Sequence, residues 1–583
     1  MKGCDVRSDG MSGKFMSLLA EKILVSFLSK GYFPKELPVT FVTQSFAKNA
    51  RNIIKDWEAQ KVFSKRSAKD FKSNKTFPSG KSGYKELNTE PEVLTKPKRT
   101  YERRTIHLTH PIPQSLLCFE ISQDWQALQK ILSRQIYSQD KIIFSEHYSR
   151  GIKDINFPLH RAKKAYVSAT SDWLVKTDVS RFYPSIYTHS IAWAAYGKEK
   201  VKSDLKKYNG SFADRLDVLV RGCNRNQTIG IPIGPETSRI IAEIVSTGVD
   251  REFATLESKI PLATIDRLQD DWVIGMNSLD EAERALSHLV AAYRKYSLDI
   301  NGSKTSVTHI LKSSTDDWKT EISSFLSHRP GALLGTRLAT FLQLSLKLQL
   351  QNPSEPVVNY VLAVIEGTRF SDDDLPELES FLLACAAISP GSMDQICRII
   401  LNIEHFTRKL SKERITLRFL DLFKKNLQKG ATFECIWILH TLRGMKVNID
   451  GRSIIDMCSD VPSSVLRILL MDISSSGKLA GKLPLDTWRD EATDERTRTD
   501  WTWLYAYEGL RRGWLSDKYG LLNKSFFLPM HSRNVFFYDP TRNVKSSKGV
   551  KKAKSVLRFK QYVEAAFAMR LLRGFESSLQ FYD

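Results

Sequence analysis

The hydrophobic and polar positions between residue 172 and about residue 312 alternate between strand-like and helix-like periods. In chain order, the pattern predicts a buried strand at 173–178, a helix near 188–196, a turn at 230–234 with a helix after Pro235, a β-hairpin from 262–265 and 272–274, a helix after the capping pair Ser278 and Glu281, and a strand from about Leu298. The order β-α-β-β-α-β is that of the split, ferredoxin-like unit.

This topology predicts where three carboxylates lie. The first and second strands of such a unit run parallel, so the end of the first lies level with the hairpin turn after the second. Asp178 ends the first strand, and Asp270 and Asp271 occupy that turn, so we expect the three to meet at one edge of the sheet. Mg²⁺ prefers oxygen ligands and commonly joins one or two carboxylates to substrate phosphates. Asp270 and Asp271 alone would fit a solvated turn, but Asp178 at the matching strand end favours a metal site.

From about residue 333 to the C-terminus, successive amphipathic stretches separated by short polar breaks predict helices. Helical hairpins of this kind stack into α-solenoids, although the sequence has no strict repeat. An irregular helical domain is the alternative. The chain is therefore expected to comprise an N-terminal part (1–171), the β-α-β-β-α-β unit (172–312) and a C-terminal α-helical part (313–583).

Composition and charge narrow the class of protein. Of 583 residues, 42% are hydrophobic and 26% are charged, which is typical of a globular chain. Lys and Arg (87) outnumber Asp and Glu (65), and the net charge of +22 favours a polyanionic partner, either nucleic acid or an acidic membrane surface. The sequence has no long apolar run or signal-peptide pattern, and its seven scattered cysteines form no C-x-x-C pair. We therefore expect a cytoplasmic protein without a disulfide framework or a zinc site.

Two segments concentrate the positive charge. Residues 61–85 contain eight basic residues and one acidic residue, with four aromatic residues between them, and residues 542–560 contain eight basic residues and no acidic one. A solvated loop is the simplest interpretation of either segment. The aromatic residues favour nucleic-acid binding, because a base stacks where the backbone phosphates are neutralised. A membrane-surface protein is the weaker alternative, since no amphipathic helix with a cationic face is evident.

The residues around the three carboxylates resemble the motifs of reverse transcriptases. Residues 176–186 (KTDVSRFYPSI) resemble motif A, residues 231–235 (IPIGP) resemble motif B, Asp270-Asp271 resembles motif C and residues 301–305 (NGSKT) resemble motif D. With residues 31–38 and 226–230, they are similar to the bacterial abortive-infection and defence-associated reverse transcriptases, which are anti-phage proteins. The resemblance extends to about residue 312, and the helical part agrees only in type.

The resemblance implies an α+β fold with reverse-transcriptase fingers (1–171, with a basic insertion at about 61–105) and a ferredoxin-like palm (172–312). An all-α, HEAT-like helical-repeat domain would follow at 313–583. The implied activity is addition of dNTPs by two Mg²⁺ ions, with Mn²⁺ as a substitute, in bacterial antiviral defence. The implied partners are a single-stranded DNA product, a non-coding RNA and further copies of the chain in a homo-oligomer, without a membrane.

The resemblance also implies roles for individual residues. Asp178, Val179, Asp270 and Asp271 form the implied metal set, and Lys304 assists the leaving pyrophosphate. Tyr183 lies under the nucleotide sugar, where an aromatic ring selects deoxynucleotides. The remaining implied nucleotide-binding residues are Phe182, Arg161, Lys163, Lys164, Ile233 and Gly234. Core packing is the alternative for Tyr183, and a solvated turn lysine is the alternative for Lys304.

Two departures from the motifs bear on template copying. Leu268 replaces the usual aromatic residue of motif C, and Ile233 replaces the glutamine of motif B, whose amide helps to position the incoming nucleotide. These departures put faithful template copying in doubt. The resemblance to the abortive-infection branch, whose members need no template and attach the first nucleotide to a protein hydroxyl, implies untemplated, protein-primed synthesis as the first expectation. RNA-templated synthesis on a bound non-coding RNA, as in other defence members, is the alternative. A third possibility is an inactive scaffold that binds nucleic acid. The tyrosines considered as primers in the helical part are Tyr505, Tyr507, Tyr538 and Tyr582.

Overall fold

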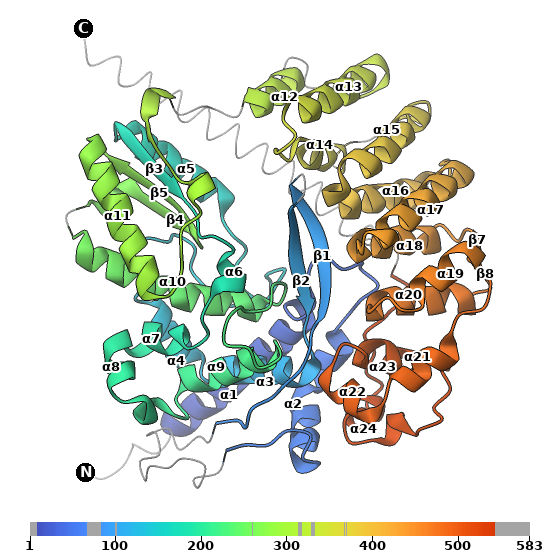
Figure 1. The fold of residues 1–583 in the computed structure, drawn as a ribbon, viewed down its shortest axis with the longest axis horizontal. Helices are drawn as coiled ribbons and strands as arrows, with labels where there is room; N and C mark the ends of the chain where they lie inside the picture. The colour runs from blue at the N-terminus through green and yellow to red at the C-terminus, as the bar shows by residue number, and fades with distance from the viewer. Residues whose placement is uncertain are drawn as a thin grey trace.

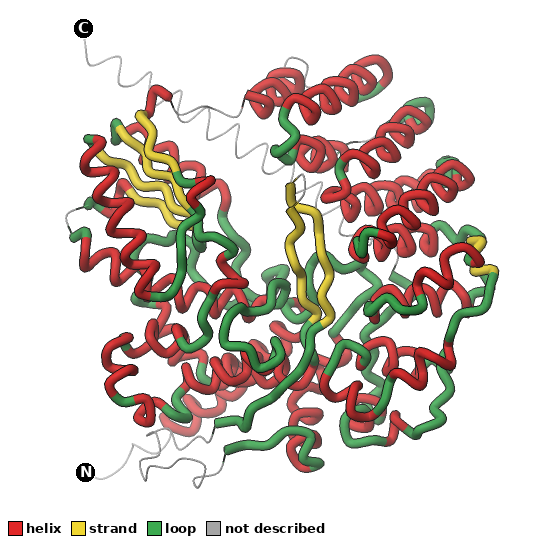
Figure 2. The backbone as a smooth tube through the Cα atoms, in the orientation of Figure 1, coloured by secondary structure: helices red, strands yellow, loops and turns green. Residues whose placement is uncertain are grey.

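The computed structural model describes residues 8–66, 83–99, 102–258, 260–312, 317–327, 333–366, 368 and 370–542. Most of the chain is helical. A small sheet lies at the upper left of the view, and a separate β-hairpin stands near the centre (Figure 1; Figure 2). Most of the basic segment 61–85 (residues 67–82), nearly all of the basic segment 542–560 (residues 543–560) and Tyr582 lie outside the described residues. Within the described residues, no helix is both long and apolar enough to cross a membrane.

The N-terminal part contains five helices and one hairpin among its described residues. These are α1 (Ser8–Lys30), α2 (Gln44–Ala59), β1 (Glu92–Arg99), β2 (Glu102–Leu108), α3 (Pro111–Gln123), α4 (Trp125–Leu132) and α5 (Phe157–Ala169). The central unit then contains β3 (Trp173–Thr177), α6 (Phe182–Ser185), α7 (Ser190–Tyr196), α8 (Lys198–Ser203), η2 (Leu205–Tyr208), α9 (Phe212–Gly222), α10 (Glu236–Leu256), η3 (Leu262–Thr264), β4 (Ile265–Leu268), β5 (Asp271–Met276), α11 (Leu279–Lys295), η4 (Gly302–Lys304), β6 (Ser306–His309) and η5 (Ile310–Lys312).

The central sheet has the order β4-β5-β3-β6, and every neighbouring pair is antiparallel. This is the strand order of the predicted β-α-β-β-α-β unit. The register pairs Thr177 with Trp272 and Leu268 with Asp271, so the end of β3 lies beside the β4–β5 turn. One prediction was wrong. The last strand was expected from about Leu298, but it is β6, which begins at Ser306. Close to Leu298, the described residues form an isolated bridge between Ile300 and Val179.

Helices cover both faces of this sheet because its side chains alternate. Leu174 and Val273 pack with Val167 of α5 on one face. The side chains of Val175 and Ile274 belong to the main core instead, on the face against which α11 packs, with α10 beneath it (Figure 1). The α11 helix begins as predicted, because the Ser278 hydroxyl accepts a hydrogen bond from the Glu281 N–H at 3.3 Å.

The C-terminal part is a succession of helices, each packed on close neighbours in the chain. They are α12 (Asp317–Ser327), α13 (Gly335–Gln351), α14 (Val357–Glu366), α15 (Leu375–Ile388), α16 (Met393–Thr407), α17 (Lys412–Gln428), α18 (Thr432–Gly444), α19 (Arg452–Cys458), α20 (Ser464–Ser475), α21 (Leu485–Glu491), α22 (Asp494–Thr499), α23 (Trp503–Arg511) and α24 (Leu528–His531), with η6 (Pro390–Ser392), η7 (Leu521–Asn523) and a two-strand pair, β7 (Ile449–Asp450) and β8 (Leu479–Ala480).

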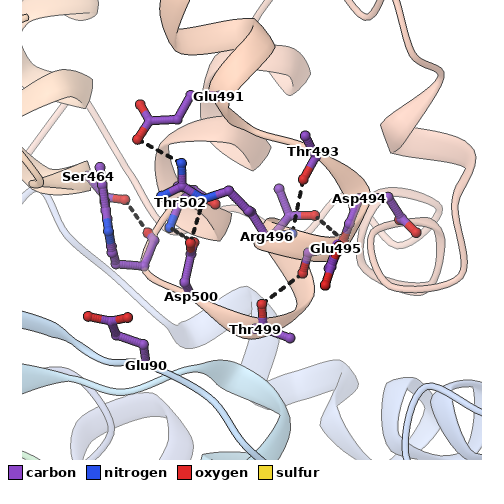
Figure 3. Close-up of polar contacts among 12 residues, drawn as sticks. Glu90, Ser464, Glu491, Thr493, Asp494, Glu495, Arg496, Thr499, Asp500 and Thr502 are labelled. Carbon is purple, nitrogen blue, oxygen red and sulfur yellow. Dashed lines mark hydrogen bonds and ion pairs between the residues drawn. The ribbon is translucent and has the colours of Figure 1, made fainter. Parts of the chain in front are cut away.

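The C-terminal helices return to the N-terminal part and share its core. The Val42 N–H donates to the Phe537 carbonyl at 2.9 Å, and the Trp57 indole donates to the Phe526 carbonyl at 2.9 Å. The end of α22 makes a further contact, because the Glu90 N–H donates to the Thr499 carbonyl at 2.7 Å. Figure 3 shows the polar contacts around α22. The N-terminal and C-terminal parts therefore pack as one body.

The β1–β2 hairpin stands between the central sheet and the C-terminal helices (Figure 1). Ion pairs attach it to those helices: Lys96 contacts Asp394 of α16 at 2.9 Å, and Arg103 contacts Glu434 of α18 at 2.7 Å. The Glu434 side chain is only 1% exposed. The hairpin is therefore fixed to the helical part through buried or half-buried charges.

Glu92, at the base of this hairpin, carries a prediction about pH. Its Oε1 accepts hydrogen bonds from the Ser463 hydroxyl at 2.5 Å and the Val465 N–H at 3.4 Å. Burial raises the pKa of Glu92 to about 7. The folded protein therefore holds this proton more tightly than the unfolded chain does, and stability falls as pH rises from about 4.5 to about 7. We expect Glu92→Gln to remove this dependence, so that its stability relative to the parent rises by about 3 kcal/mol between pH 4 and pH 8.

Thermal or urea unfolding across that pH range measures this difference. Glu102→Gln is the matched control, because the Glu102 side chain is 60% exposed. The free energy of unfolding of Glu102→Gln should change with pH as that of the parent does. A Glu92→Gln curve parallel to the parent curve would contradict the prediction.

Candidate active site

The structure brings Asp178, Asp270 and Asp271 together at one edge of the sheet. Asp178 follows β3 and is 7% exposed, Asp270 lies in the two-residue turn between β4 and β5, and Asp271 is the first residue of β5. Burial raises the pKa of Asp270 to about 7, and the negative charges of Asp271 and Asp178 contribute to that rise. Asp271 is more exposed, but partial desolvation of its carboxyl and the charge of Asp178 still raise its pKa. The three groups thus repel one another across a partly desolvated site.

Lys304 lies against this cluster. Its ammonium group forms an ion pair with Oδ2 of Asp178, while Oδ1 of Asp178 is buried and has no hydrogen-bond partner among the described residues. The loop that carries Lys304 is fixed to the end of β3, because the Asn301 N–H donates to the Asp178 carbonyl at 2.8 Å. The sequence therefore folds so that motifs A and D meet at one carboxylate.

The residues present fit a divalent cation that prefers oxygen. Within the described part of the chain, no three His, Cys, Asp or Glu side chains form a ready-made metal site. Mg²⁺ does not need one, because it keeps several waters and takes further oxygens from substrate phosphates. The unpartnered Asp178 Oδ1 and the mutual repulsion of the carboxylates are the features that such a cation would relieve.

The turn that carries Asp270 rests on a buried charge network that the sequence did not reveal. Arg267 of β4 is fully buried and contacts Glu243 at 2.6 Å and Asp250 at 2.7 Å, both on α10. Its guanidinium also donates to the Gln269 carbonyl at 2.9 Å. Gln269 has a left-handed backbone with φ +57°, so this hydrogen bond holds a strained turn beside Asp270.

A second buried pair lies on the same strand. Asp266 of β4 is fully buried and contacts Nδ1 of His160, from α5, at 3.0 Å. Two consecutive charged residues inside a four-residue strand are the only sequence signal of these buried partners. That signal indicates that the strand carries buried charges, but it does not predict which residues on other elements pair with them.

The two aromatic residues of motif A differ in position. Tyr183 is half-buried. After desolvation, the negative charge of Asp270 is the largest cause that raises the pKa of its phenol. Phe182 is 4% exposed and packs edge-to-face on Tyr183 with ring centroids 5.7 Å apart. Val179 is 3% exposed and bridges to Ile300. Tyr183 is thus the aromatic residue beside the carboxylates, while Phe182 supports it from the core.

Motif B is tied to the β1–β2 hairpin. The Ile233 N–H donates to Nδ1 of His107 at 3.0 Å, and the Ile233 carbonyl accepts from the His107 N–H at 2.7 Å. Gly234 has φ +134°, and a Cβ there would lie 2.8 Å from Pro34 and 3.1 Å from the His107 carbonyl. Glycine is therefore required at 234 for both conformation and space. These contacts place the start of α10 against β2 and the 31–38 segment.

The predicted cations of α5 point in different directions. Lys164 lies near Asp271, and its positive charge opposes the rise in the pKa of that carboxyl. The Lys163 ammonium instead donates to the Leu262 carbonyl at 3.2 Å. Arg161 is exposed on the same helix. The positive charge of Lys98, on β1, also opposes the rise in the pKa of Asp271, and no sequence pattern singles out this lysine.

Three of the tyrosines considered as primers are inaccessible. Tyr505, Tyr507 and Tyr538 are fully buried. Their hydroxyls donate to the Trp488 carbonyl at 2.9 Å, the Val535 carbonyl at 2.9 Å and Asp472 at 2.7 Å, respectively. None of these three hydroxyls can reach the carboxylate cluster without unfolding of the surrounding helices.

Comparison with solved structures finds distant telomerase chains. The structure of apo telomerase from Candida tropicalis is 12% identical over 72% of this chain and 73% of that chain, with a TM-score of 0.28. Telomerase from Candida albicans, in complex with a fragment of telomeric RNA, is 12% identical over 74% and 69%, with a TM-score of 0.25. A search of curated protein sequences found no match.

A protein-family comparison identifies the central part of the chain. Residues 119–338 match the family described as reverse transcriptase (RNA-dependent DNA polymerase). The matched segment contains the whole central sheet, the three clustered carboxylates and Lys304. The chain therefore contains a reverse-transcriptase domain, and it is a nucleotidyltransferase of the RNA-directed DNA polymerase type.

Proposed function

We propose that this reverse-transcriptase domain adds deoxynucleotides to a growing 3′ end, with Asp178 and Asp270 as the ligands of two Mg²⁺ ions and Asp271 beside them. The observation that carries the proposal is the convergence of three carboxylates at the end of β3 and the β4–β5 turn. Two such ions, when bound, hold the attacking and leaving oxygens of an in-line phosphoryl transfer. The oxygen donors and the unpartnered Asp178 Oδ1 support this assignment.

The surrounding side chains have roles that follow from their charge. Lys304 balances Asp178 before substrate binds and is free to turn to the pyrophosphate leaving group. Lys164 and Lys98 supply positive charge on the side of Asp271, where a triphosphate would need it. The Tyr183 ring, next to Asp270, would lie under the sugar and exclude a 2′-hydroxyl.

For the mode of synthesis, we favour copying of a bound RNA into DNA. The support is the family that residues 119–338 match, which is described as RNA-dependent. Untemplated, protein-primed synthesis is the second candidate, because the apolar Ile233 cannot donate the amide hydrogen bond expected in motif B. A primer hydroxyl would then come from a residue other than Tyr505, Tyr507 and Tyr538, which are buried.

The biological role that we propose is bacterial anti-phage defence. The support for it is the resemblance of residues 31–38 and 226–230 to the defence-associated reverse transcriptases. Gly31 has a physical role within that similarity, since a Cβ there would lie 2.9 Å from the Cβ of Glu236, at the start of α10. The 31–38 segment therefore supports the motif B region.

Incorporation of labelled dNTPs by purified protein with Mg²⁺ tests the proposal. We expect no product after nuclease treatment, and DNA complementary to the RNA once co-purified RNA is restored. DNA that forms without any nucleic acid and shifts on proteinase treatment would support the second candidate and contradict templated synthesis. No product under any condition would contradict polymerase activity and leave the nucleic-acid-binding scaffold.

A further inference from the structure

A basic hollow lies on the outer side of the central unit, away from the carboxylate cluster. Its volume is about 680 Å³, and it is lined by Lys198 of α8 and by Ser287, Val290, Ala291, Arg294 and Lys295 of α11. Figure 1 shows α8 and α11 at the left margin of the molecule, whereas the β1–β2 hairpin and α6 lie towards its centre. None of the proposed catalytic or nucleotide-binding residues lines this hollow.

The cations of the hollow are held in place by neighbouring groups. The Lys198 ammonium donates to the Lys295 carbonyl and lies 4.5 Å from the centroid of the Trp193 ring. Lys202 lies 5.6 Å from the same ring. Cations above an indole face are attracted by the ring and remain available to a ligand on their other side. Lys198 and Lys202 are thus positioned by Trp193, and neither forms an ion pair with a carboxylate among the described residues.

Positive charge predominates around the hollow. Residues 198–207 contain five lysines and two acidic residues, Glu199 and Asp204. Lys295 pairs with Glu252 at 2.6 Å, but the pair between Arg294 and Asp299 is long, at 3.7 Å, and both side chains are more than 70% exposed. Burial and the charges of Lys202 and Lys295 lower the pKa of Lys198, with Glu199 and Glu252 opposing them. An anion would relieve this repulsion.

Aromatic rings lie beside the cations. Tyr196 and Tyr208 stack with centroids 4.9 Å apart and an interplanar angle of 22°. Lys207 lies 5.9 Å from the Tyr208 ring. Aromatic faces interleaved with lysines are the pattern by which proteins bind single strands without sequence preference. A small free phosphate would use the cations but not these rings.

We propose that this α8–α11 basic hollow is a second nucleic-acid site, which binds the phosphodiester backbone of a single strand outside the catalytic centre. The lysines that continue from α8 into η2 would follow the strand beyond the hollow. RNA and DNA share the backbone chemistry, so either strand could occupy the site. Because the hollow contains none of the proposed catalytic residues, the proposal does not depend on polymerase activity.

A charge-reversal pair tests the site. Lys202→Glu/Arg294→Glu changes two exposed cations, and Lys347→Glu/Lys429→Glu makes the same charge change at exposed positions of the C-terminal part. Fluorescence anisotropy with labelled 20-nucleotide RNA and DNA, at several salt concentrations, measures the affinity. We expect the first pair to weaken binding about tenfold relative to the second pair. The slope of log affinity against log salt should fall by about 1.4, at ~0.7 for each lost phosphate contact to a single strand.

Photo-crosslinking locates the strand independently. RNA containing 4-thiouridine and DNA containing 4-thiothymidine are bound to the full chain with Asp270→Asn, so that turnover plays no part. We expect crosslinked peptides from residues 193–208 or 287–295. Equal affinities and salt slopes for the two charge-reversal pairs, or crosslinks confined to other peptides, would overturn the proposal. Complete displacement of the labelled strand from this surface by inorganic pyrophosphate at equal concentration would indicate a small-anion site instead.

Discussion

Replacing Asp270 by Asn is expected to lower nucleotide incorporation at least about 10³-fold, a loss of roughly 4 kcal/mol of transition-state stabilisation. The change removes one charged oxygen at the β4–β5 turn and keeps the shape of the side chain. The same substitution should not lower the free energy of unfolding, although it lowers activity. The pKa of Asp270 is raised to about 7, first by burial and then by Asp271, so the neutral amide should leave the apo protein equally stable or more stable near pH 8.

Single-turnover incorporation and thermal unfolding, each with and without Mg²⁺, separate these effects. Mg²⁺ should raise the melting temperature of the parent chain but not that of the Asp270→Asn variant, which gives a readout independent of activity. Asp280→Asn, on an exposed residue in the first turn of α11, is the matched control and should retain activity within about twofold. An Asp270→Asn enzyme with more than a tenth of parental activity, or one that melts well below the parent, would contradict the proposed role.

The carboxylate cluster could be predicted from sequence because local rules fix it. A buried strand, a short polar turn and the topology of one supersecondary unit are enough to bring Asp178 level with Asp270 and Asp271. The last strand was misplaced for a local reason as well. Residues 306–309 (SVTH) contain a single strongly apolar residue and are half-buried along their whole length, so they lack the apolar pattern that marks a strand.

Long-range contacts explain what the sequence could not predict. The β1–β2 hairpin contains charged residues on both faces and was anticipated only as a basic insertion. Its partners Asp394 and Glu434 lie 298 and 331 residues further along the chain than Lys96 and Arg103. No local periodicity reports such pairs. The burial of Tyr505, Tyr507 and Tyr538 likewise depends on helices that meet only in the folded chain.

Arg267 is a buried residue that sequence patterns overlook, and replacing it by Met is expected to destabilise the domain strongly. The guanidinium is fully buried between Glu243 and Asp250. Its removal would leave two carboxylates buried without their cation, which typically costs about 3–5 kcal/mol. It would also remove the hydrogen bond to the Gln269 carbonyl that supports the turn carrying Asp270. The urea concentration at the midpoint of unfolding and the rate of single-turnover incorporation should therefore both fall.

A stability loss alone would not establish that Arg267 positions the turn, so a compensated variant is needed. Arg267→Met/Glu243→Gln/Asp250→Asn removes the cation and both charges together, and replacement of a whole buried network is often nearly neutral for stability. We expect this triple variant to recover most of the lost stability but to incorporate nucleotide at least tenfold more slowly than the parent, because Gln269 still lacks its donor. Arg284→Met removes a half-exposed cation from the buried Glu257, which keeps its contact with Nδ1 of His288 at 2.8 Å. This control should cost about 1 kcal/mol or less and leave incorporation unchanged. Full activity in the triple variant would show that the buried network serves folding and not the geometry of Asp270.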